Sequence, residues 1–310
     1  MDYPYYNNYI SHRKIREDFK KLQNYRVRKT HLLKLSSLYS IQETYNSLNR
    51  ITDYFSEECR VKCSFQSNLP PLEQYQKIKN RITEGMNYQE IDYIIYKNIR
   101  GCTNFNITIV ISVLKFFKPE RYLDFSAGWG DRLIGAMAYG CEYTGVDPSE
   151  CMNPKYKEMI KFFKPNSDDK YKVHKKGFEN FKVKEEYYDL VFTSPPFFDL
   201  EIYEDEKSQS VKKFNTIKKW KKKFLFPSLK KSFLSLKHGG HMAIYVNDYY
   251  KDGKKYSYVR DMRKFISEMD MKYLGTFNWV NVESSMKIRD IYVWKSYKVL
   301  NILYKNRRWN

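Results

Sequence analysis

Short apolar runs recur along the second part of the chain. The runs with the length and composition of buried strands are 122–125, 143–146, 188–192, 242–246, 273–277 and 291–294. Between the first two, residues 131–138 carry apolar side chains at helical spacing. Strands that alternate with helices predict an α/β domain with a mostly parallel sheet, which the last two runs close as a hairpin pair.

The first hundred residues follow a helical pattern instead. We expect helices over 11–28, 29–55, 72–82 and 88–99, with a linker or turn at 68–71. The second helix would carry an apolar stripe toward the core, made of Leu32, Leu33, Leu35, Leu38 and Ile41. Because the pattern changes near Arg100, we predict an N-terminal helical region over 1–100, which would help to hold the substrate, and an α/β domain over 101–310.

A glycine turn follows the first predicted strand. Ser126-Ala127-Gly128-Trp129-Gly130 precedes the predicted helix, and Asp147 ends the next strand about twenty residues later. A side chain at Gly128 or Gly130 would keep the backbone from closing on a nucleotide-like ligand, and the Asp147 carboxylate can accept both hydroxyls of a ribose. A tight connection without a ligand is the alternative. The spacing of Asp147 favours a nucleoside-containing cofactor.

The residues of this turn also match a sequence motif of a known family. Asp124-x-Ser126-x-Gly128-x-Gly130 is shorter than the dinucleotide pattern and resembles motif I of the class I S-adenosylmethionine-dependent methyltransferases. The resemblance implies a Rossmann-like fold with a seven-stranded, mostly parallel sheet, and S-adenosylmethionine as cofactor. It implies contacts to the methionine part from Asp124, Ser126, Ala127, Gly128 and Gly130, to the ribose from Asp147, and to the adenine from Phe178 or Glu179.

The segment before the first strand looks like motif X of the same family. Residues 102–108, Cys-Thr-Asn-Phe-Asn-Ile-Thr, precede an apolar helix. The resemblance implies that Thr103 and Phe105 pack near the methionine part of the cofactor. A plain helix N-cap explains these residues equally well. With the motifs that follow, the resemblance covers roughly residues 101 to 298.

A proline pair follows the predicted strand 188–192. Ser194-Pro195-Pro196-Phe197 resembles motif IV of the amino-methyltransferases. The alternative is that the two prolines form only a rigid turn without a role in catalysis. An exocyclic amine on a base is a poor nucleophile, because its lone pair is delocalised into the ring. The Ser194 side chain and the Pro195 carbonyl could accept its two N–H groups, and two prolines leave no competing backbone N–H. Phe197 or Phe198 would stack on a base taken out of its helix.

The target base stays open between adenine N6 and cytosine N4. Ser194 stands where adenine-N6 enzymes mostly carry Asp or Asn, and serine is more typical of cytosine-N4 enzymes and some adenine-N6 enzymes. Methylation at C5 of cytosine is disfavoured, because that reaction needs a cysteine thiolate near the proline pair. All five cysteines precede the pair, at Cys59, Cys63, Cys102, Cys141 and Cys151.

The net charge agrees with a nucleic-acid partner. The 310 residues carry a formal net charge of +20 and a sequence pI near 9.4, a field that favours polyanions. We predict nucleic-acid contacts from Lys218, Lys219, Trp220, Lys221, Lys222 and Lys223, with a solvated helix face as the alternative. Abundant Lys, Asn, Tyr and Ile are typical of an AT-rich genome, such as that of a large DNA virus, phage or microbe, which accounts for part of the charge.

Cysteine usage and hydropathy suggest a soluble intracellular protein. Five cysteines without a Cys-x-x-Cys pair favour reduced thiols, no structural disulfides and no metal site. No apolar run is long enough to span a bilayer, and the start of the chain lacks a signal core. We therefore expect a protein of the cytoplasm, or of the compartment that holds its nucleic acid, and we expect no membrane partner.

These observations predict direct methyl transfer from S-adenosylmethionine to an exocyclic amine of a base, first of all in DNA. An RNA base or a protein glutamine amide is the first alternative, because a planar amide presents a similar group to the proline pair. A catalytically silent nucleic-acid-binding subunit with the same fold is the second alternative.

Overall fold

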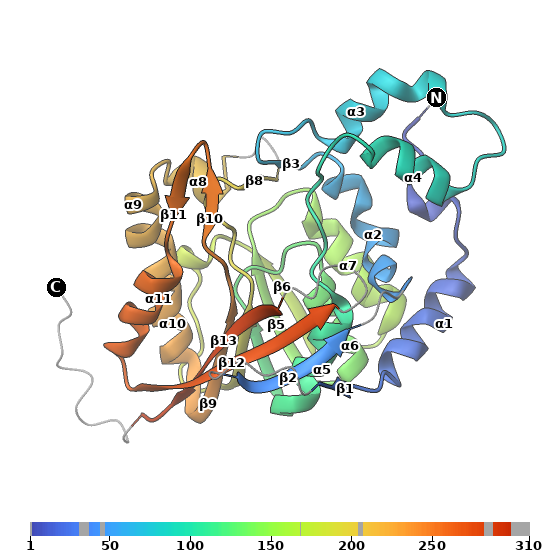
Figure 1. Ribbon diagram of the computed structural model, residues 1–310. Helices are drawn as coiled ribbons and strands as arrows, with labels where there is room; N and C mark the ends of the chain where they lie inside the picture. The colour runs from blue at the N-terminus through green and yellow to red at the C-terminus, as the bar shows by residue number, and fades with distance from the viewer. Residues whose placement is uncertain are drawn as a thin grey trace.

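The structure is a computed structural model, and it describes residues 2–30, 37–43, 47–167, 169–203, 207–281 and 288–298. One large sheet runs through the molecule, and helices lie on both of its faces (Figure 1). Among these residues, no helix is both long and apolar enough to cross a membrane.

Nine strands form the sheet, in the order β1-β2-β12-β13-β9-β7-β4-β5-β6. Their bounds are β1 Arg28–Lys29, β2 Ser37–Glu43, β4 Arg121–Asp124, β5 Glu142–Asp147, β6 Tyr171–Lys175, β7 Tyr188–Thr193, β9 Leu236–Tyr245, β12 Met271–Asn281 and β13 Ile288–Ser296. The five strands from β9 to β6 pair in parallel, whereas β13 is antiparallel to both β9 and β12. The order of these five is that of a doubly wound Rossmann-like sheet. The Rossmann-like fold expected from the sequence is confirmed, including the closing hairpin pair. The sheet has nine strands instead of the expected seven, because β1 and β2 of the N-terminal region add to the edge beside β12.

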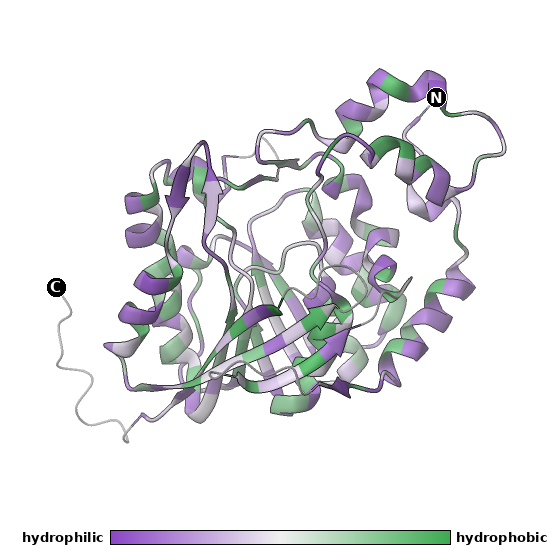
Figure 2. Ribbon diagram, viewed as in Figure 1, coloured by the Kyte–Doolittle hydropathy of each residue, from purple (hydrophilic) through white to green (hydrophobic). Residues whose placement is uncertain are grey.

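Successive side chains of the central strands point into two different cores, as the pleat of a strand requires. Tyr122 belongs to one buried cluster and Leu123 to the other, and the same alternation recurs at Val191 and Phe192. The first cluster is covered by α1 His12–Gln23, α2 Arg50–Arg60, α5 Ile107–Phe117, α6 Asp131–Tyr139 and α7 Met152–Phe163. The second is covered by α9 Ile217–Trp220, the π-helix η5 Lys221–Leu225, α10 Phe226–Ser235 and α11 Val259–Ser267. Figure 2 shows the hydrophobic residues gathered on the sheet and on the helix faces turned toward it.

Shorter helices and strands complete the fold. They are η1 Tyr6–Asn8, η2 Ser47–Asn49, β3 Ser64–Phe65, α3 Pro71–Ile78, η3 Lys79–Arg81, α4 Tyr88–Tyr96, η4 Phe178–Asn180, β8 Glu201–Ile202, α8 Ser210–Lys213, β10 Tyr249–Lys251 and β11 Lys254–Tyr256. The helices expected over 72–82 and 88–99 are confirmed by α3 and α4. The helix expected over 11–28 is confirmed only as far as Gln23, where α1 ends, because Arg28 lies in β1. Ser11 caps α1, and Asn87 and Glu90 form a capping box on α4.

The helix expected over 29–55 is wrong. β2 occupies part of this range and pairs in parallel with β12, and α2 begins only at Arg50. Of the expected apolar stripe, Leu38 and Ile41 lie in β2, and Leu32, Leu33 and Leu35 lie outside the described residues. The free edge of β12 supplies backbone hydrogen bonds to this segment, and this tertiary pairing overrides the helical spacing. The N-terminal region thus contributes two strands to the sheet as well as helices.

The expectation of reduced cysteines without disulfides is also wrong. Cys59 is bonded to Cys151, and Cys63 is bonded to Cys102, across sequence separations of 92 and 39 residues. Cys141 is free and buried. Both bonds join the short stretch 59–63, at the end of α2, to segments that border the central sheet. The pairing was hidden in the sequence because each partner lies far away along the chain and only the fold brings them together.

We expect these bonds to stabilise the folded chain. Replacing Cys63 and Cys102 together by serine should lower the free energy of unfolding by about 2 to 4 kcal/mol, because the unfolded chain loses a cross-link. Urea unfolding of both proteins under non-reducing conditions measures the difference, and Cys141→Ala is the matched control for loss of a thiol. If alkylation of the unfolded wild-type protein, without reductant, labels all five cysteines, the pairing is wrong.

Candidate active site

The candidate site lies where the parallel strands end. The chain proceeds from β4 outward to β5 and β6, and then crosses to the other side of β4 to form β7 and β9. Ligands of doubly wound sheets bind at such a switch point, beyond the carboxyl ends of the strands. Gly128 follows β4, Asp147 ends β5 and Ser194 follows β7. The topology thus brings the three segments singled out in the sequence to one edge of the sheet.

Two cavities open at this edge. The first has about 880 Å³ of empty space, including its mouth, and Ser126, Gly128, Asp147, Phe178, Pro196 and Phe198 are among its walls. The second has about 1640 Å³ by the same measure and is lined by Thr103, Phe105 and Phe197. Gly128, Trp129, Ser194, Glu201 and Tyr203 line both. The two cavities therefore meet beside Ser194.

The turn in the first cavity is held against Asp147. The backbone N–H of Gly128 donates to one carboxylate oxygen of Asp147 at 2.9 Å, and the N–H of Ser149 donates to the other at 3.0 Å. Burial nevertheless raises the pKa of Asp147 to about 6, against the effect of these two hydrogen bonds. Asp147 is half-buried and faces the cavity, so its oxygens can accept further donors there.

Gly130 shapes the turn without lining a cavity. It has a φ of +95° and precedes the first residue of α6, and a Cβ at this position would lie 2.6 Å from the sulfur of Met159. Glycine is therefore required both for the backbone conformation and for the packing of α7 against the turn.

Asp124 lies beneath the turn and is completely buried. Its carboxylate accepts hydrogen bonds from Arg132 Nε at 2.8 Å, the Tyr143 hydroxyl at 2.9 Å and the Thr193 hydroxyl at 2.7 Å. The N–H of Ser126 also donates to it, at 3.2 Å. Both oxygens are thus used inside the protein, whereas the resemblance implied a direct contact with the cofactor. Asp124, Ala127, Gly130 and Pro195 are not among the described residues that line either cavity.

Thr103 and Phe105 line the second cavity rather than the first. The nearness to the methionine part that motif X implied for them stays a prediction. The N-cap alternative holds for the neighbouring Asn106, whose side chain accepts from the N–H of Thr108 at 3.1 Å at the start of α5. The N–H of Phe105 donates to the buried Asp131 at 3.2 Å, which fixes the segment against the start of α6.

Aromatic rings form much of the second cavity. The ring centroid of Phe105 lies 5.3 Å from that of Tyr245, which lies 5.1 Å from Trp279 and 6.1 Å from Phe197. Flat walls of this kind suit a flat ring as ligand. Tyr245 and Trp279 could not be predicted as site residues, because in the sequence they look like ordinary core residues of two strands and only the sheet brings them together.

Charged groups also face this cavity. Glu43, at the end of β2, accepts a hydrogen bond from the Thr108 hydroxyl, and burial raises its pKa to about 7. Burial likewise raises the pKa of Asp131 to about 7. Arg132 and Arg289 are on the same lining. Among the residues that the structure describes, no group of three His, Cys, Asp or Glu side chains is placed to hold a metal ion.

The lysine-rich segment differs from the prediction at its centre. Trp220 is fully buried, packs against Phe198 and Phe224, and donates its indole N–H to Ser210 at 3.0 Å. It therefore has no face for a base, and its predicted nucleic-acid contact is wrong. Helical periodicity explains the error, because the tryptophan occupies the inner face of α9 and the lysines the outer one.

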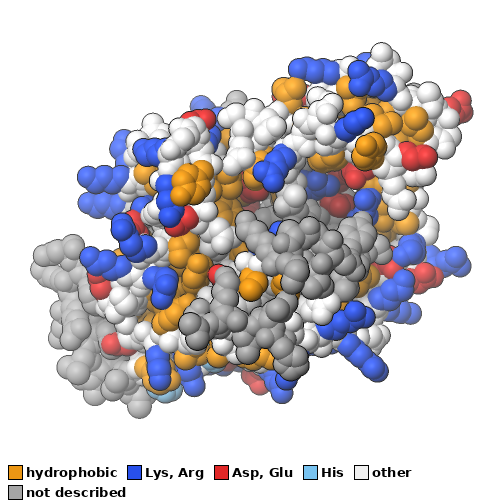
Figure 3. All heavy atoms as spheres, in the orientation of Figure 1, with side chains coloured by type: hydrophobic (Ala, Val, Ile, Leu, Met, Phe, Trp, Pro, Cys, Tyr) orange, Lys and Arg blue, Asp and Glu red, His pale blue; other side chains and the backbone are white. Residues whose placement is uncertain are grey.

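The lysines around Trp220 are not equivalent. Lys221 forms an ion pair with Asp261 at 2.6 Å, whereas the exposed members are Lys218, Lys219, Lys222 and Lys223. On the face shown in Figure 3, lysine and arginine side chains lie on several sides of the molecule and do not gather in one patch. The predicted phosphate contacts of the exposed lysines stay a prediction.

No known family and no curated protein matches the sequence. The fold is similar to solved methyltransferases. One is the Burkholderia thailandensis 1,6-didemethyltoxoflavin-N1-methyltransferase, solved with 1,6-didemethyltoxoflavin and S-adenosylhomocysteine; the identity is 10%, the TM-score 0.44, and the coverage 62% of this chain and 78% of that one. TrmN from Thermus thermophilus is 13% identical, with a TM-score of 0.43 and coverage of 62% of this chain and 49% of that one. The tRNA (m1A58) methyltransferase TrmI from Aquifex aeolicus is 13% identical, with a TM-score of 0.40 and coverage of 65% of this chain and 73% of that one.

The buried Asp124–Arg132 pair should be essential for the shape of the site. Asp124→Ala leaves the Arg132 guanidinium buried without its carboxylate, which should cost about 3 to 5 kcal/mol in the free energy of unfolding. Glu17→Ala, which breaks an exposed pair with Arg13, is the control and should change it by less than about 1 kcal/mol. Equal effects of the two substitutions in urea unfolding would contradict the role of Asp124.

Proposed function

We propose that the protein is an S-adenosylmethionine-dependent methyltransferase that acts on an exocyclic amino group of a nucleic-acid base, in DNA in the first instance. The observation that carries the proposal is the meeting of the two cavities at Ser194. A nucleoside-type cavity with Asp147 on its wall opens there onto an aromatic cavity, and the Ser-Pro-Pro-Phe segment forms the border.

The first cavity fits the cofactor. Asp147 would accept the ribose hydroxyls, and the backbone at Gly128, which has no side chain, would allow the ligand to approach closely. Phe178 would contact the adenine, since its ring lines the cavity and is held by a stacked Phe125 at 5.0 Å. Bound there, S-adenosylmethionine supplies an activated methyl group on a sulfonium.

The second cavity would hold the acceptor. A base extruded from its helix would stack among Phe105, Phe197 and Tyr245, and its amine would point toward Ser194. The Ser194 hydroxyl would accept one N–H of the amine and orient the lone pair toward the first cavity. Proximity and orientation would then supply most of the rate, without a covalent enzyme intermediate. The excess of positive charge would favour a polyanionic substrate over a protein amide.

The affinity for S-adenosylmethionine should depend on pH through Asp147. The pKa of this carboxyl is raised to about 6 in the free protein, and the ionised form is the better acceptor for both ribose hydroxyls. Affinity should therefore be full above pH 6 and fall as the pH decreases through this value. Isothermal titration calorimetry across this range measures the effect.

Asp147→Asn is the matched variant. It should bind the cofactor about 10-fold or more weakly at neutral pH, because hydrogen bonds to a charged group contribute about 1.5 to 3 kcal/mol each. It should also lack the pH dependence. An unchanged affinity, or the same pH profile in both proteins, would rule out Asp147 as the ribose ligand.

Transfer itself should be visible on nucleosides. DNA, RNA and a glutamine-containing peptide incubated with labelled S-adenosylmethionine, then digested and analysed by mass spectrometry, should show label on N6 of adenine or N4 of cytosine from DNA. Phe197→Ala should weaken base binding by about 1 to 3 kcal/mol through lost stacking, and Ser194→Ala should lower kcat with little change in cofactor affinity.

The other outcomes separate the alternatives. Label on RNA or on the peptide amide alone would replace the DNA proposal by one of these substrates. Cofactor binding without transfer to any of the three would indicate a silent binding subunit. Label at C5 of cytosine would contradict direct transfer, because that reaction needs a cysteine nucleophile.

A further inference from the structure

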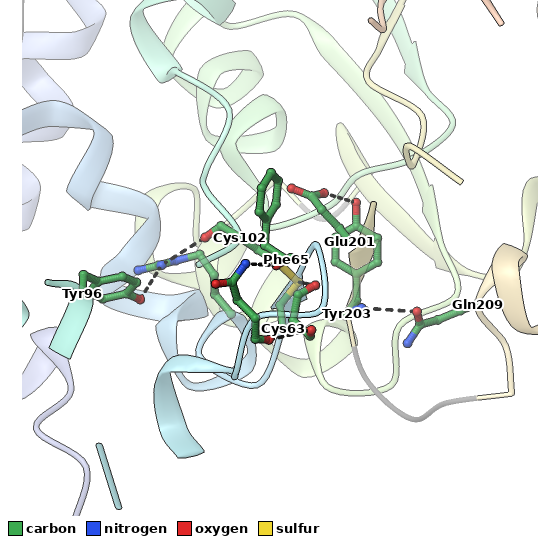
Figure 4. Close-up of a disulfide and its surroundings, with 10 residues drawn as sticks. Cys63, Phe65, Tyr96, Cys102, Glu201, Tyr203 and Gln209 are labelled. Atoms are coloured by element: carbon green, nitrogen blue, oxygen red, sulfur yellow. Dashed lines mark hydrogen bonds between the residues drawn. A yellow bond between two sulfur atoms is a disulfide. The ribbon is translucent and has the colours of Figure 1, made fainter. Parts of the chain in front are cut away.

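Glu201 lies at the junction of the two cavities and belongs to neither expected motif. It follows the Ser-Pro-Pro-Phe segment in β8, which pairs with β3 of the N-terminal region, Phe65 opposite Glu201. The N–H of Gln66 also donates to the carbonyl of Leu200 at 2.9 Å. Figure 4 shows Phe65, Glu201 and Tyr203 side by side, next to the Cys63–Cys102 bond. The position of Glu201 is therefore set by a second strand and, through Cys63, by a disulfide.

The Glu201 carboxylate has one clear hydrogen-bond donor. The Tyr203 hydroxyl donates to it at 2.6 Å, and the Tyr203 ring stands edge-on to Trp129 at 5.5 Å. The N–H of Tyr203 donates to the side chain of Gln209 at 3.3 Å, which holds this short segment in place (Figure 4). No Lys or Arg in the described part of the chain forms an ion pair with Glu201. The carboxylate thus retains free acceptor capacity toward the cavities that it lines.

The acceptor amine needs two hydrogen-bond acceptors, and the motif provides one. An exocyclic amine carries two N–H groups, whereas Ser194 presents a single hydroxyl in place of a carboxylate or amide. The carbonyl of Pro195 was the expected second acceptor, but Pro195 is buried and is not among the described residues on either cavity wall. Glu201 is the carboxylate that lines both cavities together with Ser194.

We propose that Glu201 is a catalytic residue that accepts the second N–H of the acceptor amine and then its proton. This inference rests on the proposed function. In the step, the amine nitrogen forms its bond to the methyl carbon, the electron pair of the broken carbon–sulfur bond stays on the sulfur, and the proton passes from nitrogen to the Glu201 carboxylate and on to solvent. Tyr203 is a positioning residue, because its hydroxyl orients that carboxylate.

The electrostatics are consistent with this role. Burial raises the pKa of Glu201, while the hydrogen bond from Tyr203 opposes the rise. A raised pKa makes the carboxylate a better proton acceptor, and it makes kcat increase with pH as Glu201 ionises. The other titratable or charged groups that line the second cavity are Glu43, Asp131, Arg132, Tyr203, Tyr245, Asp248, Tyr249 and Arg289. To assign the pH dependence of kcat to Glu201, the wild-type protein must therefore be compared with a variant that lacks only the Glu201 carboxylate.

Glu201→Gln is that variant, because it keeps the size of the side chain and one acceptor oxygen. We expect kcat to fall about 100-fold or more, as for loss of a general base. The rise of kcat with pH due to Glu201 should disappear, while the Kd for S-adenosylmethionine from calorimetry stays within about twofold. Tyr203→Phe should lower kcat less and keep the pH dependence. Glu17→Gln, an exposed carboxylate far from the site in the sequence, is the control and should behave as wild type.

A binding measurement gives a readout that does not need turnover. With S-adenosylhomocysteine present, fluorescence anisotropy of a mixed-sequence oligonucleotide should show weaker binding to Glu201→Gln, by roughly tenfold. The same oligonucleotide with abasic sites should bind both proteins equally. A variant that keeps kcat and oligonucleotide affinity, or that loses cofactor affinity in parallel, would overturn the role of Glu201. A wild-type protein that methylates none of the substrates would instead overturn the proposed function.

Discussion

The buried carboxylate of Asp124 is the interaction on which the rest of the site depends. It receives donors from α6, β5, β7 and the glycine turn, through Arg132, Tyr143, Thr193 and the N–H of Ser126. These segments carry or border the turn, Asp147 and Ser194. A buried ion pair of this kind is costly to desolvate and harmful to break, so its value lies in fixing one arrangement of several segments. The two cavities meet at Ser194 because these strand ends are tied to one another.

The N-terminal region completes the wall of the second cavity. β2 brings Glu43 to the wall of the second cavity, and β3 pairs with β8, which contains Glu201. Both disulfides join the stretch 59–63 to residues of the second part of the chain, Cys151 and Cys102. Cys102 immediately precedes Thr103, which lines the second cavity, and Cys151 immediately precedes Met152, which lines the first. Among the described residues, the region before Arg100 thus reaches the second cavity through Glu43, Asn49, Phe65 and Gln66, whereas every residue that lines the first cavity follows Arg100.

Local pattern was enough to predict the strand at 122–125, the turn that ends at Gly130 and the place of Asp147 at the end of the next strand. It did not show that Asp124, Ala127 and Gly130 support the turn without lining either cavity, because burial depends on the packing of the whole fold. β2 could not be predicted, because its partner β12 lies more than two hundred residues away, as between Ser40 and Asn278. The nucleic-acid contact predicted for Trp220 was wrong, because the sequence of a basic, amphipathic segment does not show which of its residues face the core. Glu201 belongs to no recognisable motif, and its place at the junction depends on the pairing of β8 with the distant β3.

A crystal structure of the protein with S-adenosylhomocysteine would show directly which cavity takes the cofactor and where its sulfur points. We expect the ribose hydroxyls on the Asp147 carboxylate, the adenine against Phe178, and the sulfur directed past Gly128 toward Ser194 and the second cavity. A cofactor bound elsewhere, or one whose sulfur is separated from Ser194 by protein atoms, would contradict the proposed division of the two cavities.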